Sequence, residues 1–285
     1  MTTRYTDEEW SKIIADAEKR FKANGSKKYP IPEIGSEDFT RTVDHTLLKL
    51  DAKSNQFDDL CAEARINKFA NVCVRPNWVQ KCVTDLKGSG VSVASVVGFH
   101  EGTYDLSEKL SDVKLSLTSG AAELDIVINW PDLQKKQYSK IYTELCTLRT
   151  SAPPPVLLKL ILETSQLSPS EIITGCVLAS YANFDFVKTS TGFCGGGAKE
   201  EDVRLMKLCC QHMRQGQGNK EMRVKASGGI RTLEDAVKML EAGASRLGTS
   251  GGVWIAKEAR ERVEWVKNGG EGDRPGMATR LFTDY

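Results

Sequence analysis

The feature that most constrains the fold is an alternation of short β-rich segments with amphipathic stretches, repeated eight times between residues 41 and 267. The predicted strands are "TVDHTL" (42–47), "ANVCVRP" (70–76), "VSVASVVGF" (91–99), "ELDIVIN" (123–129), "PVLLKLILE" (155–163), "FDFVKTS" (184–190), "MRVKASG" (222–228) and "SRLGTS" (245–250). Helices are predicted between and after them near 56–67, 77–87, 106–119, 132–150, 168–182, 199–214, 232–243 and 252–266. Eight such units predict an α/β chain with a (β/α)8 TIM barrel fold. An open doubly wound sheet is disfavoured, because no G-x-G-x-x-G follows the first strand.

The first 40 residues form an N-terminal helical extension to this barrel. The capping box "TDEE" begins a predicted helix over 6–23, and apolar residues recur within it at helical spacing. The stretch "NGSKKYPIPEIGSED" then separates this helix from the barrel. We therefore divide the chain into a helix and linker (1–40), a barrel (41–267) and a flexible Gly-rich tail (268–285). The extension is expected to cover one end of the barrel or to mediate association.

The composition excludes several classes of partner. The chain has 39 basic and 38 acidic residues, a net charge of +1 and no block of like charge, so neither nucleic acid nor a membrane surface is expected as a partner. No signal-peptide pattern and no run of 18 apolar residues is present, and we expect a soluble cytoplasmic protein. The eight cysteines lack CxxC spacing and the three histidines lack metal-ligand spacing, so we expect reduced thiols, no metal and no cofactor.

Polar side chains are predicted inside the barrel. Alternate residues of a barrel strand point inward, and the apolar residues that must face the helices set the phase. The inward residues are then Asp44, Thr46, Cys73, Asp125, Lys159, Lys188 and Lys225. Buried ion pairs are one explanation, but they give little net stability. Lysines near the carboxyl ends of barrel strands, where active sites lie, favour chemistry instead.

Lys188 and Lys225 lie on consecutive predicted strands, so their ammonium groups are expected about 5–7 Å apart. At an effective dielectric near 20 their repulsion is roughly 2–3 kcal/mol, which lowers one lysine pKa by about two units, and burial lowers it further. A neutral amine attacks a carbonyl to form an imine, which accepts electrons as the neighbouring C–C bond breaks. With Asp125 and a second lysine to transfer protons, the sequence predicts a metal-free aldolase.

Three glycine-rich turns predict that the substrate carries a phosphate group. "GFCGGG", "SGGIRT" and "GTSGG" follow the last three predicted strands. Backbone amides at this end of such barrels bind phosphate. We therefore expect a phosphorylated small molecule as substrate.

The motifs resemble one known family. "DHTLLK" (44–49), "ELDIVIN" (123–129), "LLKLILET" (157–164), "VKTSTGF" (187–193), "VKASGGIRT" (224–232) and "RLGTSGG" (246–252) resemble the deoxyribose-phosphate aldolases, which are class I aldolases with a (β/α)8 fold. The resemblance covers about residues 40 to 255. It implies reversible cleavage of 2-deoxy-D-ribose 5-phosphate, a phosphosugar, to acetaldehyde and D-glyceraldehyde 3-phosphate in deoxyribonucleotide catabolism.

The resemblance also implies roles for individual residues. Lys188 becomes the Schiff-base lysine, Lys225 the neighbour that lowers its pKa, and Asp125 the proton-relay carboxylate. The implied substrate and phosphate contacts are Thr46, Cys73, Lys159, Gly192, Gly228, Gly229 and Ser250. Tyr285 matches a C-terminal tyrosine that can assist proton transfer from a flexible tail.

Two positions depart from some members of this family. Phe193 and Gly251 stand where those members have a lysine and a second serine, which predicts weaker phosphate binding or other phosphate donors. Two other functions remain open: another Schiff-base phosphosugar aldolase or transaldolase, and a non-catalytic phosphosugar-binding barrel whose lysines grip an anion. A homodimer is a further expectation.

Overall fold

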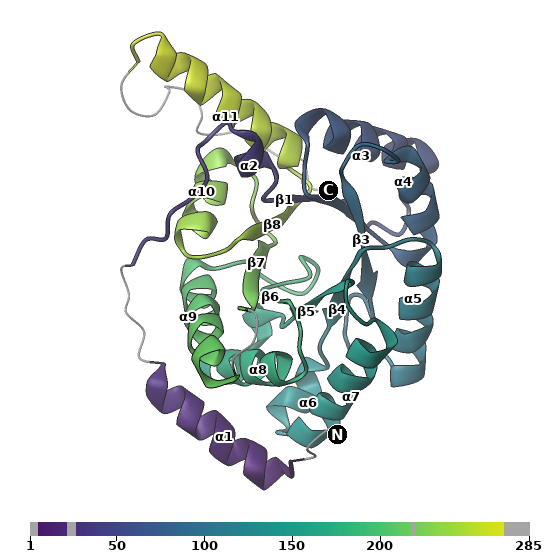
Figure 1. Ribbon diagram of the computed structural model, residues 1–285, viewed down its shortest axis with the longest axis vertical. Coiled ribbons are helices and arrows are strands. Elements are labelled where there is room, and N and C mark those ends of the chain that lie inside the picture. Colours follow the sequence, from purple (N-terminus) through teal and green to yellow (C-terminus); the bar gives the residue numbers. More distant parts are fainter. Residues whose placement is uncertain (1–4, 22–26, 218–220, 271–285) are drawn as a thin grey trace.

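The computed structural model, which describes residues 5–21, 27–217 and 221–270, is a closed parallel barrel (Figure 1). Its strands pair in sequence order, and β1 pairs with β8 to close the barrel. The strands are β1 (Val43–Thr46), β2 (Asn71–Val74), β3 (Ser92–Val97), β4 (Glu123–Val127), β5 (Leu157–Ile161), β6 (Phe186–Lys188), β7 (Arg223–Ser227) and β8 (Arg246–Thr249). The predicted (β/α)8 architecture is confirmed.

Helices surround the barrel. They are α1 (Asp7–Arg20), α2 (Glu37–Thr40), α3 (Ser54–Asn67), α4 (Val79–Asp85), α5 (Leu106–Thr118), α6 (Trp130–Gln134), α7 (Tyr138–Ser151), α8 (Pro169–Tyr181), α9 (Glu200–Gln217), α10 (Leu233–Glu241) and α11 (Gly252–Lys267). Two 3-10 turns, η1 (Pro76–Trp78) and η2 (Thr164–Gln166), precede α4 and α8. The single helix predicted over 132–150 is two helices, because Lys136 adopts a left-handed φ of 59° between them. None of the described helices is both long enough and apolar enough to span a membrane.

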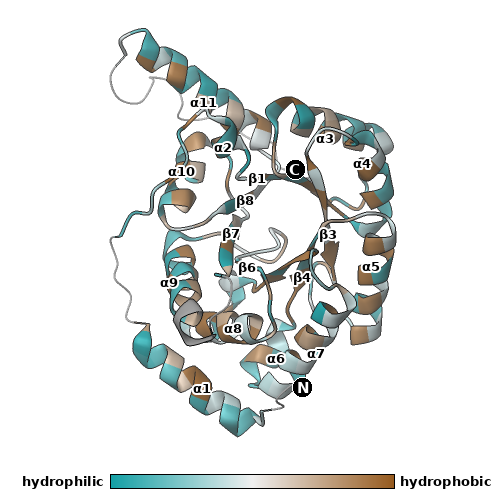
Figure 2. Ribbon diagram, in the orientation of Figure 1, coloured by the Kyte–Doolittle hydropathy of each residue, from teal (hydrophilic) through white to brown (hydrophobic). Residues whose placement is uncertain are grey.

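The strands bury both faces, as the pleat requires of a parallel barrel covered by helices. Outward residues such as Leu158, Leu160 and Val187 join the large core between strands and helices. A smaller apolar cluster fills part of the barrel interior and consists of Leu48, Cys73, Ala94, Val96, Phe99, Val127 and Ile161. In Figure 2 the brown colour marks hydrophobic residues along β3 and β4 and on the sides of the neighbouring helices. The interior positions left over carry the charged residues of the candidate site.

Helix α1 lies outside the ring of helices and does not cover an end of the barrel as expected (Figure 1). Trp10 is fully buried against Tyr142 of α7 and Tyr181 of α8, with ring centroids 4.9 and 5.2 Å away. Asp7 accepts a hydrogen bond from the backbone N–H of Ser139, at the start of α7. Aromatic packing and this capping contact therefore fix α1 to the middle of the chain.

Candidate active site

Two lysines meet on one carboxylate inside the barrel. Lys188, the last residue of β6, donates a hydrogen bond to Asp125 Oδ2 on β4 at 2.8 Å. Lys225 on β7 donates to the same oxygen at 2.8 Å. The two Nζ atoms therefore cannot lie farther apart than twice that distance, in agreement with the separation predicted from adjacent strands. Lys188 and Lys225 are also register partners across β6 and β7.

Further charged groups extend this cluster toward the amino ends of the strands. Lys159 on β5 donates to Asp125 Oδ1 at 2.7 Å and lies 2.6 Å from Glu123 Oε2. Lys225 also donates to Asp44 Oδ2 on β1 at 2.5 Å, across the intervening strand β8. Gly248 permits that path, because a Cβ there would lie only 2.9 Å from the Lys225 Cε atom.

The surroundings push the pKa values of the two lysines in opposite directions. Burial lowers the pKa of Lys188, the Asp125 carboxylate opposes that shift, and the Lys225 ammonium adds to it. Burial alone would lower the pKa of Lys225 too, but the carboxylates of Asp125 and Asp44 raise it above its ordinary value. Burial would raise the pKa of Asp125, yet the ammonium groups of Lys159, Lys188 and Lys225 hold it well below its usual range. Lys188 is therefore the lysine most readily made neutral, with burial as the larger cause and repulsion as the smaller.

Of the three interior lysines, only Lys188 lines the pocket at the carboxyl end of the barrel. That pocket has a volume of about 530 Å³. Lys188 is 2% exposed, whereas Lys159 and Lys225 are fully buried beneath it. A carbonyl compound in the pocket can reach the Lys188 amine directly, while Lys159 and Lys225 are joined to it through their contacts with Asp125.

Glycine-rich loops form one wall of the pocket. Gly192, Gly228 and Gly229 line it, from the loops after β6 and β7. The two loops pack backbone against backbone, since a Cβ on Gly228, which has a φ of +85°, would lie 2.8 Å from Gly197 Cα. Glu163 supports the first loop by accepting a hydrogen bond from the Thr191 N–H at 3.1 Å.

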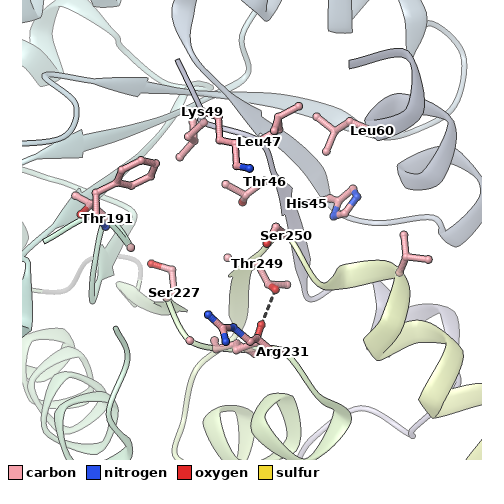
Figure 3. Close-up of a pocket in the computed structure, with 18 of the residues that line it drawn as sticks. His45, Thr46, Leu47, Lys49, Leu60, Thr191, Ser227, Arg231, Thr249 and Ser250 are labelled. Carbon is pink, nitrogen blue, oxygen red and sulfur yellow. Dashed lines mark hydrogen bonds between the residues drawn. The ribbon is translucent and has the colours of Figure 1, made fainter. Parts of the chain in front are cut away.

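A third loop, after β8, completes that wall. Thr249 Oγ1 donates to the Ile230 carbonyl at 2.6 Å and accepts from the Gly251 N–H at 2.8 Å, joining the β8 loop to the β7 loop (Figure 3). Ser250 lines the pocket beside them, immediately before the first turn of α11. The unpaired amides of a helix N-terminus favour an anion there.

The remaining residues predicted for the site fall into three positions. Thr46 lines the pocket, and its hydroxyl donates to the Asp44 carbonyl at 2.9 Å. Cys73 lies below the pocket, with Sγ 3.8 Å from Asp125 Oδ2, and burial first among several causes raises its pKa to about 11. Tyr285 lies outside the described residues.

Several residues that contribute to the site were not assigned a role from sequence. The sequence indicates Asp44 only as an inward residue, and it carries no signal for a role of Arg246. Lys49 and Arg231 line the pocket (Figure 3) and bring positive charge to it. Arg231 lies in the "SGGIRT" turn, so its place beside the glycines was the signal that could have identified it.

Phe193, one of the two positions that depart from the expected phosphate-binding pattern, makes aromatic contacts. Its ring stacks on His100 with centroids 5.2 Å apart and meets Phe99 edge-on at 5.2 Å. The contacts join the loop after β6 to the loop after β3, and Phe193 lines the pocket. This side chain therefore offers apolar surface to the pocket and no phosphate-binding charge.

Comparison with known proteins identifies close relatives. Residues 40–258 match the model of the DeoC/LacD family aldolases. A deoxyribose-phosphate aldolase from Coccidioides immitis (strain RS) is 50% identical over 232 residues, 81% of this chain and 84% of that protein. A crystal structure assigned as deoxyribose-phosphate aldolase from Coccidioides immitis superposes with a TM-score of 0.84 at 46% identity, covering 91% of this chain and 100% of that chain. A tetrameric deoxyribose phosphate aldolase from Aeropyrum pernix has a TM-score of 0.72 at 26% identity, covering 88% and 97%.

Proposed function

Because the chain belongs to the DeoC/LacD family of aldolases, we propose that it reversibly cleaves 2-deoxy-D-ribose 5-phosphate to acetaldehyde and D-glyceraldehyde 3-phosphate. The observation that carries this proposal is the placement of Lys188. It is the interior lysine that opens onto the pocket, its pKa is lowered chiefly by burial, and Asp125 lies 2.8 Å from its nitrogen. A buried neutral amine next to a proton carrier is what imine formation requires.

In the proposed reaction the neutral Lys188 amine attacks C1 of the open-chain aldehyde. Loss of water from the carbinolamine leaves an iminium ion on C1. Removal of the proton from the C3 hydroxyl breaks the C2–C3 bond, and C3 becomes the aldehyde carbon of the departing D-glyceraldehyde 3-phosphate. The electron pair of the broken bond moves toward the iminium and forms the enamine. Protonation of C2 and hydrolysis of the iminium then release acetaldehyde and the amine. We assign the proton transfers to Asp125 and Lys225, which share one hydrogen bond.

The substrate phosphate is assigned to the glycine-rich wall. Gly192, Gly228, Gly229 and Ser250 lie around the pocket, and α11 begins directly after them. A 16-residue helix directs its unpaired amides and the positive end of its dipole at this point. Arg231 adds a cation to the same wall, which offsets the absence of a lysine at the position of Phe193.

We propose four further features of the protein. We assign Tyr285 to proton transfer at C2, and we keep the division into extension, barrel and tail at residues 40 and 267. The free state of all eight cysteines supports a reducing cytosolic setting. We also propose self-association as a homodimer, in line with the tetrameric assembly of the Aeropyrum pernix relative, and light scattering would test it.

A coupled assay on 2-deoxyribose 5-phosphate tests the proposed function. Turnover should depend on Lys188, and borohydride in the presence of acetaldehyde should leave a two-carbon adduct on that residue. The matched control is Lys49→Met, which removes the other lysine of the pocket lining and should leave the adduct on Lys188. Phosphate binding without turnover or adduct in the folded protein would favour a non-catalytic phosphosugar-binding barrel. Turnover of other phosphosugars in place of this one would favour a different Schiff-base aldolase.

A further inference from the structure

A continuous series of ion pairs joins Lys188 to the opposite end of the barrel. Arg246, the first residue of β8, donates to Asp44 Oδ1 at 2.5 Å. The other oxygen of Asp44 accepts from Lys225, and Lys225 donates to Asp125 at 2.8 Å. Asp125 in turn accepts from Lys188. Arg246 does not line the pocket, so this series of contacts is its connection to the reacting amine.

The charges in this network cancel when Lys188 is neutral. Its members are the carboxylates of Asp44, Glu123 and Asp125 and the cations of Lys159, Lys225, Arg246 and Lys188. None of these side chains is more than 12% exposed. An uncompensated charge is costly in such an interior. Three carboxylates balance the three cations Lys159, Lys225 and Arg246. A protonated Lys188 would be a fourth cation with no carboxylate to balance it.

The other groups facing Arg246 do not change this count. Besides Asp44, they are Glu123 of β4 with Oε1 at 3.5 Å and the Phe186 ring of β6 at 5.7 Å. Arg223 of β7 stacks over the same ring at 4.0 Å, and burial, followed by the charge of Arg246, lowers its pKa. Arg223 is a cation that Arg246 repels and that the carboxylates of Glu123, Asp185 and Asp44 attract, but it is not one of the hydrogen-bonded groups that connect Arg246 to Lys188.

The groups facing Lys188 are equally few. They are Asp125 of β4, Lys225 of β7 and the thiol of Cys73 on β2. Burial as the first cause raises the pKa of Cys73 to about 11, so the thiol is neutral at physiological pH and contributes no charge. The protonation state of Lys188 is thus set directly by the charges of Asp125 and Lys225. It is set indirectly by the charged groups farther down the barrel that compensate those two charges.

We propose that Arg246 is a positioning residue for the Schiff-base reaction, supplying from the amino end of the barrel the positive charge that allows Lys188 to release its proton. The proposal rests on the function proposed above. Removing the guanidinium leaves three carboxylates facing Lys159 and Lys225, and Lys188 then restores the balance by keeping its proton. Removing one carboxylate instead has the opposite effect. Glu123 suits that test, because it contacts Lys159 and Arg246 and neither Lys188 nor the pocket.

The test is the pH dependence of kcat/KM in three variants. Arg246→Met should move the acid limb to higher pH by roughly one unit, the effect of a charge about 10 Å away at a dielectric near 20. Arg246→Lys keeps the charge and should leave the limb close to its original position. Glu123→Gln should move it to lower pH. Borohydride trapping of acetaldehyde on Lys188, measured across the same pH range, should shift in parallel.

The outcomes separate an electrostatic role from a structural one. A uniform loss of rate at all pH values, or an unmoved limb in Arg246→Met, overturns the proposal. If circular dichroism shows that Arg246→Met does not fold, Glu123→Gln decides, since an unmoved limb there also overturns it. Absence of turnover and trapping in the unmodified protein would refute the proposed function, whereas an active protein with insensitive variants refutes the role of Arg246 alone.

Discussion

Replacing Lys225 with methionine should raise the pKa of Lys188 and slow the reaction at neutral pH. The Nζ atoms of both lysines lie 2.8 Å from Asp125 Oδ2, so they are at most twice that distance apart. At that limit and a dielectric near 20, two unit charges repel by about 3 kcal/mol, or about two pKa units. Without Lys225, Asp125 also loses a competing cation and attracts the Lys188 proton more strongly.

The direction of the Lys188 pKa shift determines what the assay should show. The pKa of Lys188 is lowered in the folded protein, so the neutral amine is available above that value and is lost as the pH falls through it. In Lys225→Met the neutral fraction on the acid limb should fall by about 100-fold, and activity should recover as the pH rises by about two units. Initial rates at low substrate across the pH range measure this limb, with Lys225→Arg as the charge-preserving control. A limb that stays in place while the rate falls at every pH would show that Lys225 acts on protons and not on the charge of Lys188.

Three other substitutions test separate parts of the structure. Lys188→Arg should abolish turnover and borohydride trapping without unfolding the protein, because a guanidinium forms no imine; residual turnover would point to another nucleophile. Gly248→Ala places a Cβ 2.8 Å from Ser227 Cβ and 2.9 Å from Lys225 Cε, so unfolding by denaturant should show a loss of roughly 1–3 kcal/mol together with slower turnover, and an unchanged protein would mean that neither side chain packs against β8 at this point. Trp10→Ala should cost about 3–5 kcal/mol, since this ring is fully buried, and should leave KM unchanged in the folded protein; an unchanged thermal midpoint would show that α1 adds no stability.

The barrel was predictable because its pattern is local. On β5, Leu158 and Leu160 face the helices and Lys159 faces inward, as strict alternation requires. The break after α6 was not predictable, because lysine has no preference for the left-handed φ of 59° that the exposed Lys136 adopts. The four-residue α2 was missed for a similar reason, since it depends on the Ser36 cap and on complete burial of Phe39.

The residues that converge inside the barrel were predictable from strand phase, but only some of the contacts between them were. Lys188 and Lys225 lie on consecutive strands, so their proximity follows from strand order. The contact of Lys225 with Asp44 depends instead on closure of the barrel between the first and last strands and on the absence of a side chain at Gly248. Which lysine opens onto the pocket was equally inaccessible, because that depends on the depth of each side chain.

The docking of α1 has a consequence for how the chain matures. Asp7 and its partner Ser139 are 132 residues apart in sequence, and Tyr181 follows later still. During synthesis from the N-terminus, the helix leaves the ribosome long before its binding surface on α7 and α8 exists. Its apolar face therefore stays exposed to water, or bound to a chaperone, until half of the barrel has been translated. The packing of α1 on α7 and α8 is for this reason a late event in biogenesis.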